Sequence, residues 1–383
     1  MENKVIYLDN NATTPVDPRV VEAMLPFFRE NFANANSVHQ AGLKVKEAIE
    51  NARSAVAELI GADPRELIFT SGATESINLA IQGIAESYQK KGNHIITVST
   101  EHSAVLDTCR VLETKGYEVT YLSVDSGGLI DLNELKSTLR NDTILVSIMY
   151  VNNETGIIQP INAIAEIVHS TDALFMCDAT QAVGKLSIDV QALQVDLMCF
   201  SGHKFYGPKG IGALYLRHKK SRINLPALLY GGGHEGGLRS GTLNVPGIVG
   251  MGKASSIASL EFYEDMARIR ELRDELELNL LGKFPDAIIN GDRSQRIFNI
   301  TNICFPGLDA NTLIERIPNV AVSNGSACTA AVFKPSHVLK EMGLNNDQAF
   351  ASIRFSLGRF NTKDEINYGS DQIISFINTF LRV

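Results

Sequence analysis

The sequence predicts an α/β fold, in which helices cover both faces of a mainly parallel β-sheet and a smaller α+β domain lies beside it. From about residue 60 onward, short apolar runs alternate with amphipathic stretches. Polar segments that contain glycine follow several of these runs. Alternating strands and helices are typical of parallel sheets, since the crossover between two parallel strands is usually a helix.

Seven apolar runs are the expected strands of this sheet, and they lie at residues 67–70, 94–100, 118–124, 143–151, 173–179, 195–201 and 211–216. The amphipathic stretches at 76–90 and 161–170 have the apolar spacing of helices. A long helical region around 246–284 follows a glycine-rich stretch at 230–242 and is expected to link two domains. The apolar segments and terminal helix after it are enough for the smaller domain.

The composition is that of a globular protein with about two domains. Of the 383 residues, 44% are hydrophobic and 20% are charged, which is enough to bury a substantial core. The 35 basic and 43 acidic residues form no block of like charge, so we expect no nucleic-acid partner. The first residues lack a signal-peptide pattern, and no apolar run approaches the roughly 20 residues that span a bilayer. We therefore expect a cytoplasmic protein without membrane contact.

The five cysteines differ in their surroundings. Their number is odd and no CxxC pair occurs, which argues against a disulfide framework and against a zinc site. Four lie in or beside apolar runs, where a cysteine usually behaves as a small buried hydrophobe, and these are Cys109, Cys177, Cys199 and Cys304. Cys328 lies among small and polar residues in SNGSACTAAVFKPS, which predicts an exposed loop. It is either an inert loop thiol or a nucleophile activated by nearby positive charge.

Three polar features at strand ends together favour a pyridoxal phosphate site. The segment SGATES at 71–76 leads into a helix, whose free N–H groups either bind an anion or are simply capped. Asp178 either caps a helix or pairs with a protonated pyridine nitrogen. Lys204 either points to solvent or forms a Schiff base with an aldehyde cofactor. Sheets of this kind bind ligands at the carboxyl ends of their strands, so the joint occurrence favours the cofactor.

The motifs of the chain resemble, in order, those of the cysteine desulfurases of the NifS/IscS type. The matching segments are LDNNATTPVDPRV, FTSGATES, TEHSAVLDTC, VNNETG, DATQAVGK, SGHKFYGPKGIG, GGGHEGGLRSGT, SNGSACT and IRFSLGRF, and they span nearly the whole chain. The resemblance implies an aspartate-aminotransferase-like fold, the fold type I of pyridoxal phosphate enzymes. It also implies a large cofactor-binding domain at 15–257 and a small domain made of 1–14 and 258–383.

The resemblance implies pyridoxal 5′-phosphate as the cofactor and assigns residues to it. Lys204 would hold it as a Schiff base, Asp178 would pair with the pyridinium, and Gln181 would bond the ring oxygen. His102 would stack on the ring and take part in proton transfer. The residues implied for the phosphate are Ala73, Thr74, Ser201, His203 and, from the neighbouring subunit of a homodimer, Thr242.

Further residues are implied for the substrate, L-cysteine. Asn153 would contact both cofactor and substrate, and Arg354 would bind the substrate carboxylate through its planar guanidinium. Cys328 would attack the substrate sulfur, keep it as a persulfide and leave alanine. No resident metal is expected, and Cys328 would hold an iron–sulfur cluster only transiently during delivery.

The implied function is a cysteine desulfurase that supplies sulfur for iron–sulfur cluster assembly or other thio-cofactors, through a sulfur-acceptor or scaffold protein. The alternatives are a selenocysteine lyase, a pyridoxal phosphate aminotransferase, and a non-catalytic sulfur-relay or assembly partner. Two departures from the family pattern concern delivery rather than catalysis. Gly236 stands in HEGG where the family often has arginine, and the chain ends at INTFLRV, short of an extension that some members use to dock a scaffold.

Overall fold

The computed structural model of the protein describes residues 5–218, 223–325 and 334–380. Its largest sheet has seven strands in the order β2-β8-β7-β6-β5-β3-β4. They are β2 Leu67–Thr70, β3 His94–Val98, β4 Glu118–Leu122, β5 Thr143–Met149, β6 Leu174–Asp178, β7 Leu197–Ser201 and β8 Gly212–Leu216. Each predicted strand is confirmed, and the sheet is mainly parallel, as expected.

One strand runs against the rest of this sheet. β8 pairs antiparallel with both of its neighbours, β7 and β2. Only the short segment 202–211 separates β7 from β8, which is too short for the crossover that a parallel pair requires. The sequence pattern located the strand but did not give its direction.

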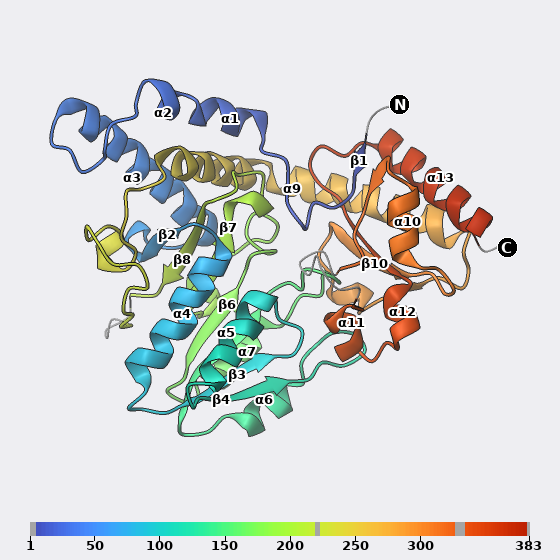
Figure 1. Cartoon of the computed structure of the whole chain (residues 1–383), viewed down its shortest axis with the longest axis horizontal. Coiled ribbons are helices and arrows are strands. Elements are labelled where there is room, and N and C mark those ends of the chain that lie inside the picture. The colour runs from blue at the N-terminus through green and yellow to red at the C-terminus, as the bar shows by residue number, and fades with distance from the viewer. Residues whose placement is uncertain (1–4, 219–222, 326–333, 381–383) are drawn as a thin grey trace.

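Helices cover both faces of the sheet (Figure 1). Val146 and Phe175 pack on one face with apolar residues of α3, α7 and α9, whereas their neighbours Leu145 and Met176 pack on the other face with α4 and α5. This is why the strands are apolar throughout rather than alternating. The helices of the first part of the chain are α1 Pro18–Met24, α2 Pro26–Arg29, α3 Gln40–Ile60, α4 Ala73–Tyr88, α5 Ser103–Glu113, α6 Leu132–Thr138, α7 Ile161–Val168 and α8 Val190–Leu193.

The second part of the chain forms a smaller α+β unit. Its strands are β9 Ile288–Ile289, β10 Ile300–Cys304 and β12 Ser352–Ser356, in the order β12-β10-β9, and a two-stranded parallel pair of β1 Ile6–Tyr7 with β11 Val320–Ala321. Its helices are α10 Ala310–Arg316, α11 His337–Glu341, α12 Asn346–Phe350 and α13 Lys363–Phe380. The N-terminal strand β1 thus belongs to the same unit as the C-terminal part of the chain.

The helix α9, Val245–Leu281, runs from the large sheet to the smaller unit (Figure 1). It confirms the predicted linking helix. On this arrangement we propose the domain division at residue 257, inside α9, with residues 1–14 in the small domain. In the part of the chain that the structure describes, no helix has the length and apolar character needed to cross a membrane.

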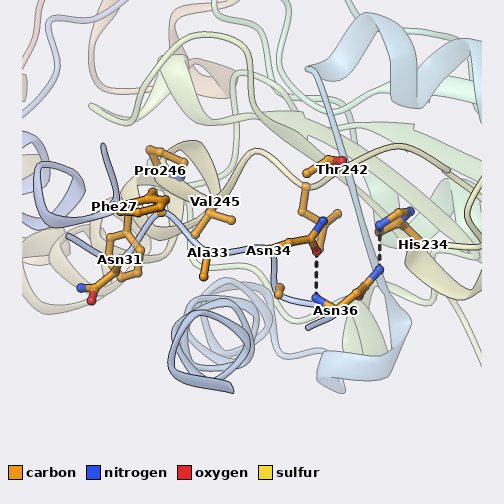
Figure 2. Close-up of a pocket in the computed structure, with 12 residues that line it drawn as sticks. Phe27, Asn31, Ala33, Asn34, Asn36, His234, Thr242, Val245 and Pro246 are labelled. Atoms are coloured by element: carbon orange, nitrogen blue, oxygen red, sulfur yellow. Dashed lines mark hydrogen bonds between the residues drawn. The ribbon is translucent and has the colours of Figure 1, made fainter. Parts of the chain in front are cut away.

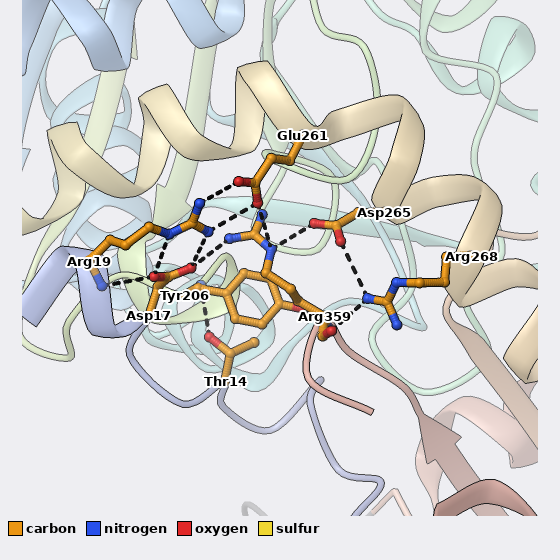
Figure 3. A network of polar contacts seen from close by, with 8 residues as sticks. All are labelled: Thr14, Asp17, Arg19, Tyr206, Glu261, Asp265, Arg268 and Arg359. Atoms are coloured by element: carbon orange, nitrogen blue, oxygen red, sulfur yellow. Dashed lines mark hydrogen bonds and ion pairs between the residues drawn. The ribbon is translucent and has the colours of Figure 1, made fainter. Parts of the chain in front are cut away.

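A charged network joins the two units beside α9 (Figure 3). Arg359, just after β12, bonds Asp17 through Nη1 at 3.0 Å and Asp265 of α9 through Nε at 2.7 Å. Its guanidinium lies over the Tyr206 ring, 4.5 Å from the centroid, and its backbone N–H donates to the Tyr206 hydroxyl at 2.6 Å. Because the Arg359 side chain is only 9% exposed, water screens these contacts weakly.

Candidate active site

A cavity of about 580 Å³ lies at the carboxyl ends of β2, β5, β6 and β7, where the fold is expected to bind ligands. Gly325 and Arg354 of the smaller unit complete its wall. The predicted residues that line it are Ala73, Thr74, His102, Asn153, Asp178, Gln181, Ser201, His203, Lys204 and Arg354. The structure therefore brings together side chains that lie up to 281 positions apart in the sequence, from 73 to 354.

Lys204 lies in a short 3-10 turn, Gly202–Lys204, that follows β7. Its Nζ donates to the carbonyls of Asn11 at 2.7 Å and Ala12 at 2.8 Å, and the side chain lines the cavity. The alternative in which this lysine simply points to solvent is therefore wrong. Two backbone carbonyls hold the amine at the cavity wall.

Asp178 and His102 both line the cavity. Asp178 is the last residue of β6, and its Oδ1 accepts the Thr180 N–H at 2.9 Å, so it caps a turn while one carboxylate edge lines the cavity. His102 caps α5, with Nδ1 accepting the Ala104 N–H at 3.1 Å. Burial lowers the pKa of His102, and Lys204 lowers it further although Asp178 opposes this. A neutral ring is therefore favoured here, which suits stacking on an aromatic cofactor.

The start of α4, which lines the cavity, is suited to an anion. The helix α4 begins at Ala73 without a side-chain cap, so its first N–H groups are available to a ligand. Its N-cap, Gly72, has a φ of 156°, which residues with side chains rarely adopt. Burial lowers the pKa of His203 to about 4, and the positive charges of Lys204 and Lys209 contribute. The charges of the two lysines would favour binding of a phosphate.

Arg354 lies in β12, on the side of the cavity that belongs to the smaller unit. It is only 3% exposed. Nη2 bonds Asp9 Oδ1 at 2.6 Å and Nη1 donates to the Asn153 carbonyl at 3.0 Å, while Nε has no hydrogen-bond partner in the described residues. A buried donor without a partner is costly, so the Nε group is suited to an incoming acceptor such as a carboxylate.

Thr242 lies apart from the other predicted residues, in a second pocket of about 210 Å³ (Figure 2). This pocket is lined by the segment around Phe32 and by His234, whose Nε2 lies 2.9 Å from Asn36 Nδ2. Thr242 therefore does not line the cavity of its own chain. Phe32 is 77% exposed beside it, which leaves an apolar surface at this position.

Cys328 lies outside the described residues. The other four cysteines are buried free thiols, as predicted, and they are Cys109, Cys177, Cys199 and Cys304. None of these four lines the cavity. Burial raises the pKa of every one of these thiols, to about 12 for Cys109, so each is a poor nucleophile.

The N-terminal segment 9–14 contributes more to the cavity than the sequence indicated. Asn11 offers its carbonyl to Lys204 and to Gln181 Nε2, and its own Nδ2 donates to the Asn153 carbonyl at 3.1 Å. Asp9 holds Arg354. The motif LDNNATTP was the signal in the sequence that could have identified these residues. It follows a strand of only two residues, which is too short to be recognised from an apolar pattern.

The residues present fit a pyridoxal phosphate group. An amine, a carboxylate and an uncapped helix start line one cavity, and Thr180 Oγ1 is buried at its wall without a hydrogen-bond partner in the described residues. Among those residues no group of three or more His, Cys, Asp or Glu side chains could hold a metal ion.

Comparison with known proteins gives the family. Residues 6–368 match the class-V aminotransferases. The chain belongs to this family. Its relatives include the cysteine desulfurase IscS of Salmonella schwarzengrund, which is 55% identical over 371 residues that cover 96% of this chain and 91% of the relative. A matching relative from Salmonella typhi has the same description and the same identity and coverage.

Solved structures of this family have the same fold. A NifS-like protein superimposes with a TM-score of 0.92 at 39% identity, and the match covers 98% of this chain and 100% of the other. SspA in complex with cysteine superimposes with a TM-score of 0.83 at 38% identity, covering 93% and 99%. These matches confirm the predicted NifS/IscS resemblance and the predicted fold class. Pyridoxal 5′-phosphate is the cofactor of this family.

Proposed function

We propose that the protein is a cysteine desulfurase that takes sulfur from L-cysteine and releases L-alanine. The observation that carries the proposal is that Lys204, Arg354 and the uncapped start of α4 line one cavity. A pyridoxal phosphate enzyme that acts on an α-amino acid uses all three: the helix start for the phosphate, the lysine for the aldehyde of the cofactor, and the arginine for the carboxylate of the substrate. The IscS relatives and the SspA complex with cysteine support cysteine as that amino acid.

Each side chain then has a distinct task. Lys204 would bind the cofactor covalently, and once displaced by the substrate its amine would remove the α-proton. Asp178 would keep the pyridine nitrogen protonated, Gln181 would donate to the ring oxygen, and the neutral His102 would stack on the ring. When bound, pyridoxal phosphate supplies an electron sink for the pair left on the α-carbon. Arg354 and Asn153 would orient the substrate carboxylate.

The remaining contacts would hold the phosphate. These are the N–H groups of Ala73 and Thr74 at the start of α4, the Ser201 hydroxyl and the His203 side chain, all from residues that line the cavity. No step of the reaction requires these groups to move a proton. Their task would be to fix the position of the ring relative to Lys204.

Cys328 would accept the sulfur. It follows the cavity residue Gly325 by three positions, a distance of about 10 Å of extended chain at most. Its thiolate would attack the substrate sulfur, the bond between that sulfur and the β-carbon would break, and a persulfide would remain on Cys328. The electron pair of the broken bond would go to the β-carbon, which would take up the proton released by the Cys328 thiol, and the α-carbon would regain the proton that Lys204 removed. Cysteine is thereby reduced to alanine while the two sulfurs are oxidised to the persulfide, so no external oxidant or reductant is needed. The buried thiols of the chain lie elsewhere, which leaves this residue the one suited to the task.

The test is incubation of Cys328→Ala with L-cysteine. The variant should keep the yellow cofactor and lose persulfide formation, because only the acceptor sulfur is missing. Lys204→Ala is the matched control, since it should lose the borohydride-trappable link to the cofactor while keeping the thiol. Unchanged sulfide release by Cys328→Ala in the presence of a reductant would refute its role. Formation of a keto acid would indicate an aminotransferase, and preferential turnover of selenocysteine would indicate a lyase.

We further propose a homodimer in which Thr242 contacts the phosphate bound to the neighbouring subunit. Its position outside its own cavity supports this, and so does the exposed Phe32 beside it. Light scattering should give the mass of two chains, and a fully active monomer would contradict the proposal. The acceptor of the sulfur would be a scaffold protein for iron–sulfur clusters or another thio-cofactor enzyme. The cytoplasmic location stays a prediction from the sequence.

A further inference from the structure

A second lysine lies directly behind the cavity wall. Lys185 is only 6% exposed, and its Nζ donates to Gln181 Oε1 at 2.7 Å. The chain after β6 turns back on itself, and the Lys185 N–H donates to the Ala182 carbonyl at 2.9 Å. Residues 181 and 185 therefore lie about one turn apart, with their side chains in contact. Gln181 lines the cavity and Lys185 does not. The Gln181 side chain therefore lies between the Lys185 amine and a ligand in the cavity.

This contact determines which way the Gln181 amide points. Its Nε2 donates to the Asn11 carbonyl at 3.0 Å, and a carbonyl can only accept. Its Oε1 accepts from Lys185 Nζ. A flipped amide would place its oxygen against the Asn11 carbonyl, and two acceptors cannot bond each other. The two partners thus fix the side chain and leave one N–H of Nε2 for a group in the cavity.

The same hydrogen bonds connect the two lysines. The Asn11 carbonyl accepts from Gln181 Nε2 and also from Lys204 Nζ at 2.7 Å. A continuous chain therefore runs from Lys185 through Gln181 and Asn11 to Lys204. Asn11 is itself held, since its N–H donates to Ser356 Oγ at 2.9 Å.

An amine at this position is costly. Burial lowers the pKa of Lys185 to about 7, and the positive charges of Lys204 and Arg354 contribute to the lowering. Its acceptor is a neutral amide rather than a carboxylate. An apolar side chain of similar length would fill the same space without the cost of burying an amine. What the buried amine provides in return is the hydrogen bond to Gln181.

We propose that Lys185 is a positioning residue of the cofactor site, which holds the Gln181 amide with an N–H directed at the ring oxygen of the cofactor. The inference rests on the proposed function, because it needs pyridoxal phosphate in the cavity and Gln181 on its ring oxygen. Lys185 does not touch the cofactor. Its effect passes entirely through Gln181, and this distinguishes it from a residue that only supports the fold.

A double-mutant cycle tests this route. Cofactor-free wild type, Lys185→Met, Gln181→Ala and the double variant are titrated with pyridoxal phosphate, and the dissociation constant and the absorption spectrum of the bound cofactor are measured. Lys185→Met should weaken binding roughly 10-fold and shift the absorption maximum, because Gln181 loses the hydrogen bond that holds its amide and its Oε1 is left without that donor. In the Gln181→Ala background the same substitution should change the dissociation constant by less than about twofold.

Val183→Ala is the matched control, since Val183 is fully buried in the same turn but carries no amine. It should lower the melting temperature of the cofactor-free protein and leave the spectrum unchanged. If Lys185→Met does not fold, Lys185→Leu, which likewise carries no donor, takes its place in the cycle. Equal weakening in both backgrounds, or an unchanged spectrum in Lys185→Met, would overturn the inference. A wild type that binds no pyridoxal phosphate would instead contradict the proposed function.

Discussion

The two walls of the cavity are built in different ways. The cofactor wall comes from consecutive strands of one sheet, and Asp178 and Lys204 lie at the ends of β6 and β7. The substrate wall comes from the two ends of the chain, because Arg354 of β12 bonds Asp9, which follows β1. The side chains of the cofactor wall thus come from one domain, although the carbonyls of Asn11 and Ala12 in the small domain hold the Lys204 amine. The substrate wall depends more directly on how the small unit is placed against the large one.

This difference predicts that substrate binding and cofactor binding can be separated. The ion pairs of Arg359 with Asp17 and Asp265 lie at the junction between the units. Arg359 follows Arg354 along the same strand and loop. Disturbing the junction should therefore affect the substrate wall first. Substitutions in each wall and at the junction should therefore separate cofactor binding from substrate binding.

Arg354→Gln should have the largest effect on the substrate wall alone. We expect kcat/KM for L-cysteine to fall about 100-fold, chiefly through KM, because a charged hydrogen-bond donor to the carboxylate is lost. The dissociation constant of pyridoxal phosphate should stay within about twofold of the wild type. Asp9→Asn, which weakens only the support of Arg354, should change KM in the same direction by less. Loss of the cofactor from Arg354→Gln would show that the walls are not independent.

Arg359→Met should loosen the junction. Removing Arg359 deprives two carboxylates, Asp17 and Asp265, of a buried positive partner. We therefore expect a loss of about 3 kcal/mol in the free energy of unfolding. KM for cysteine should rise a few-fold and the cofactor spectrum should stay unchanged. Urea unfolding measures the first effect. Arg65→Met is the control, because Arg65 pairs with Asp63 at the surface with its side chain 83% exposed, and it should cost less than about 0.5 kcal/mol.

Acid should weaken the cofactor wall by a smaller amount. Burial lowers the pKa of His203 to about 4, below its unfolded value of about 6.5. Between these values the unfolded chain takes up a proton that the folded chain does not, so stability is full above pH 6.5 and falls as the pH approaches 4. From pH 7 to 5 the cofactor-free protein should lose about 1 to 2 kcal/mol in urea unfolding. His203→Gln should remove that part of the pH dependence, and an unchanged slope would contradict this assignment.

The sequence predicted the cofactor wall better than the substrate wall for a physical reason. Buried parallel strands are continuous apolar runs, so their ends are visible, and Asp178 and Lys204 stand at those ends. Contacts between distant segments leave no such pattern. Asp9 and Arg354 are 345 positions apart, and Lys185 was present in the motif DATQAVGK without any sign that it supports Gln181. The direction of β8 was likewise set by the length of its connection.

The pairing of Asp9 with Arg354 has a consequence for synthesis on the ribosome. At about 5 to 20 residues per second, Arg354 is made roughly 17 to 70 seconds after Asp9. Until then the cavity lacks the arginine that would hold the substrate carboxylate. We therefore expect a nascent chain to gain activity toward free cysteine only when its synthesis is nearly complete.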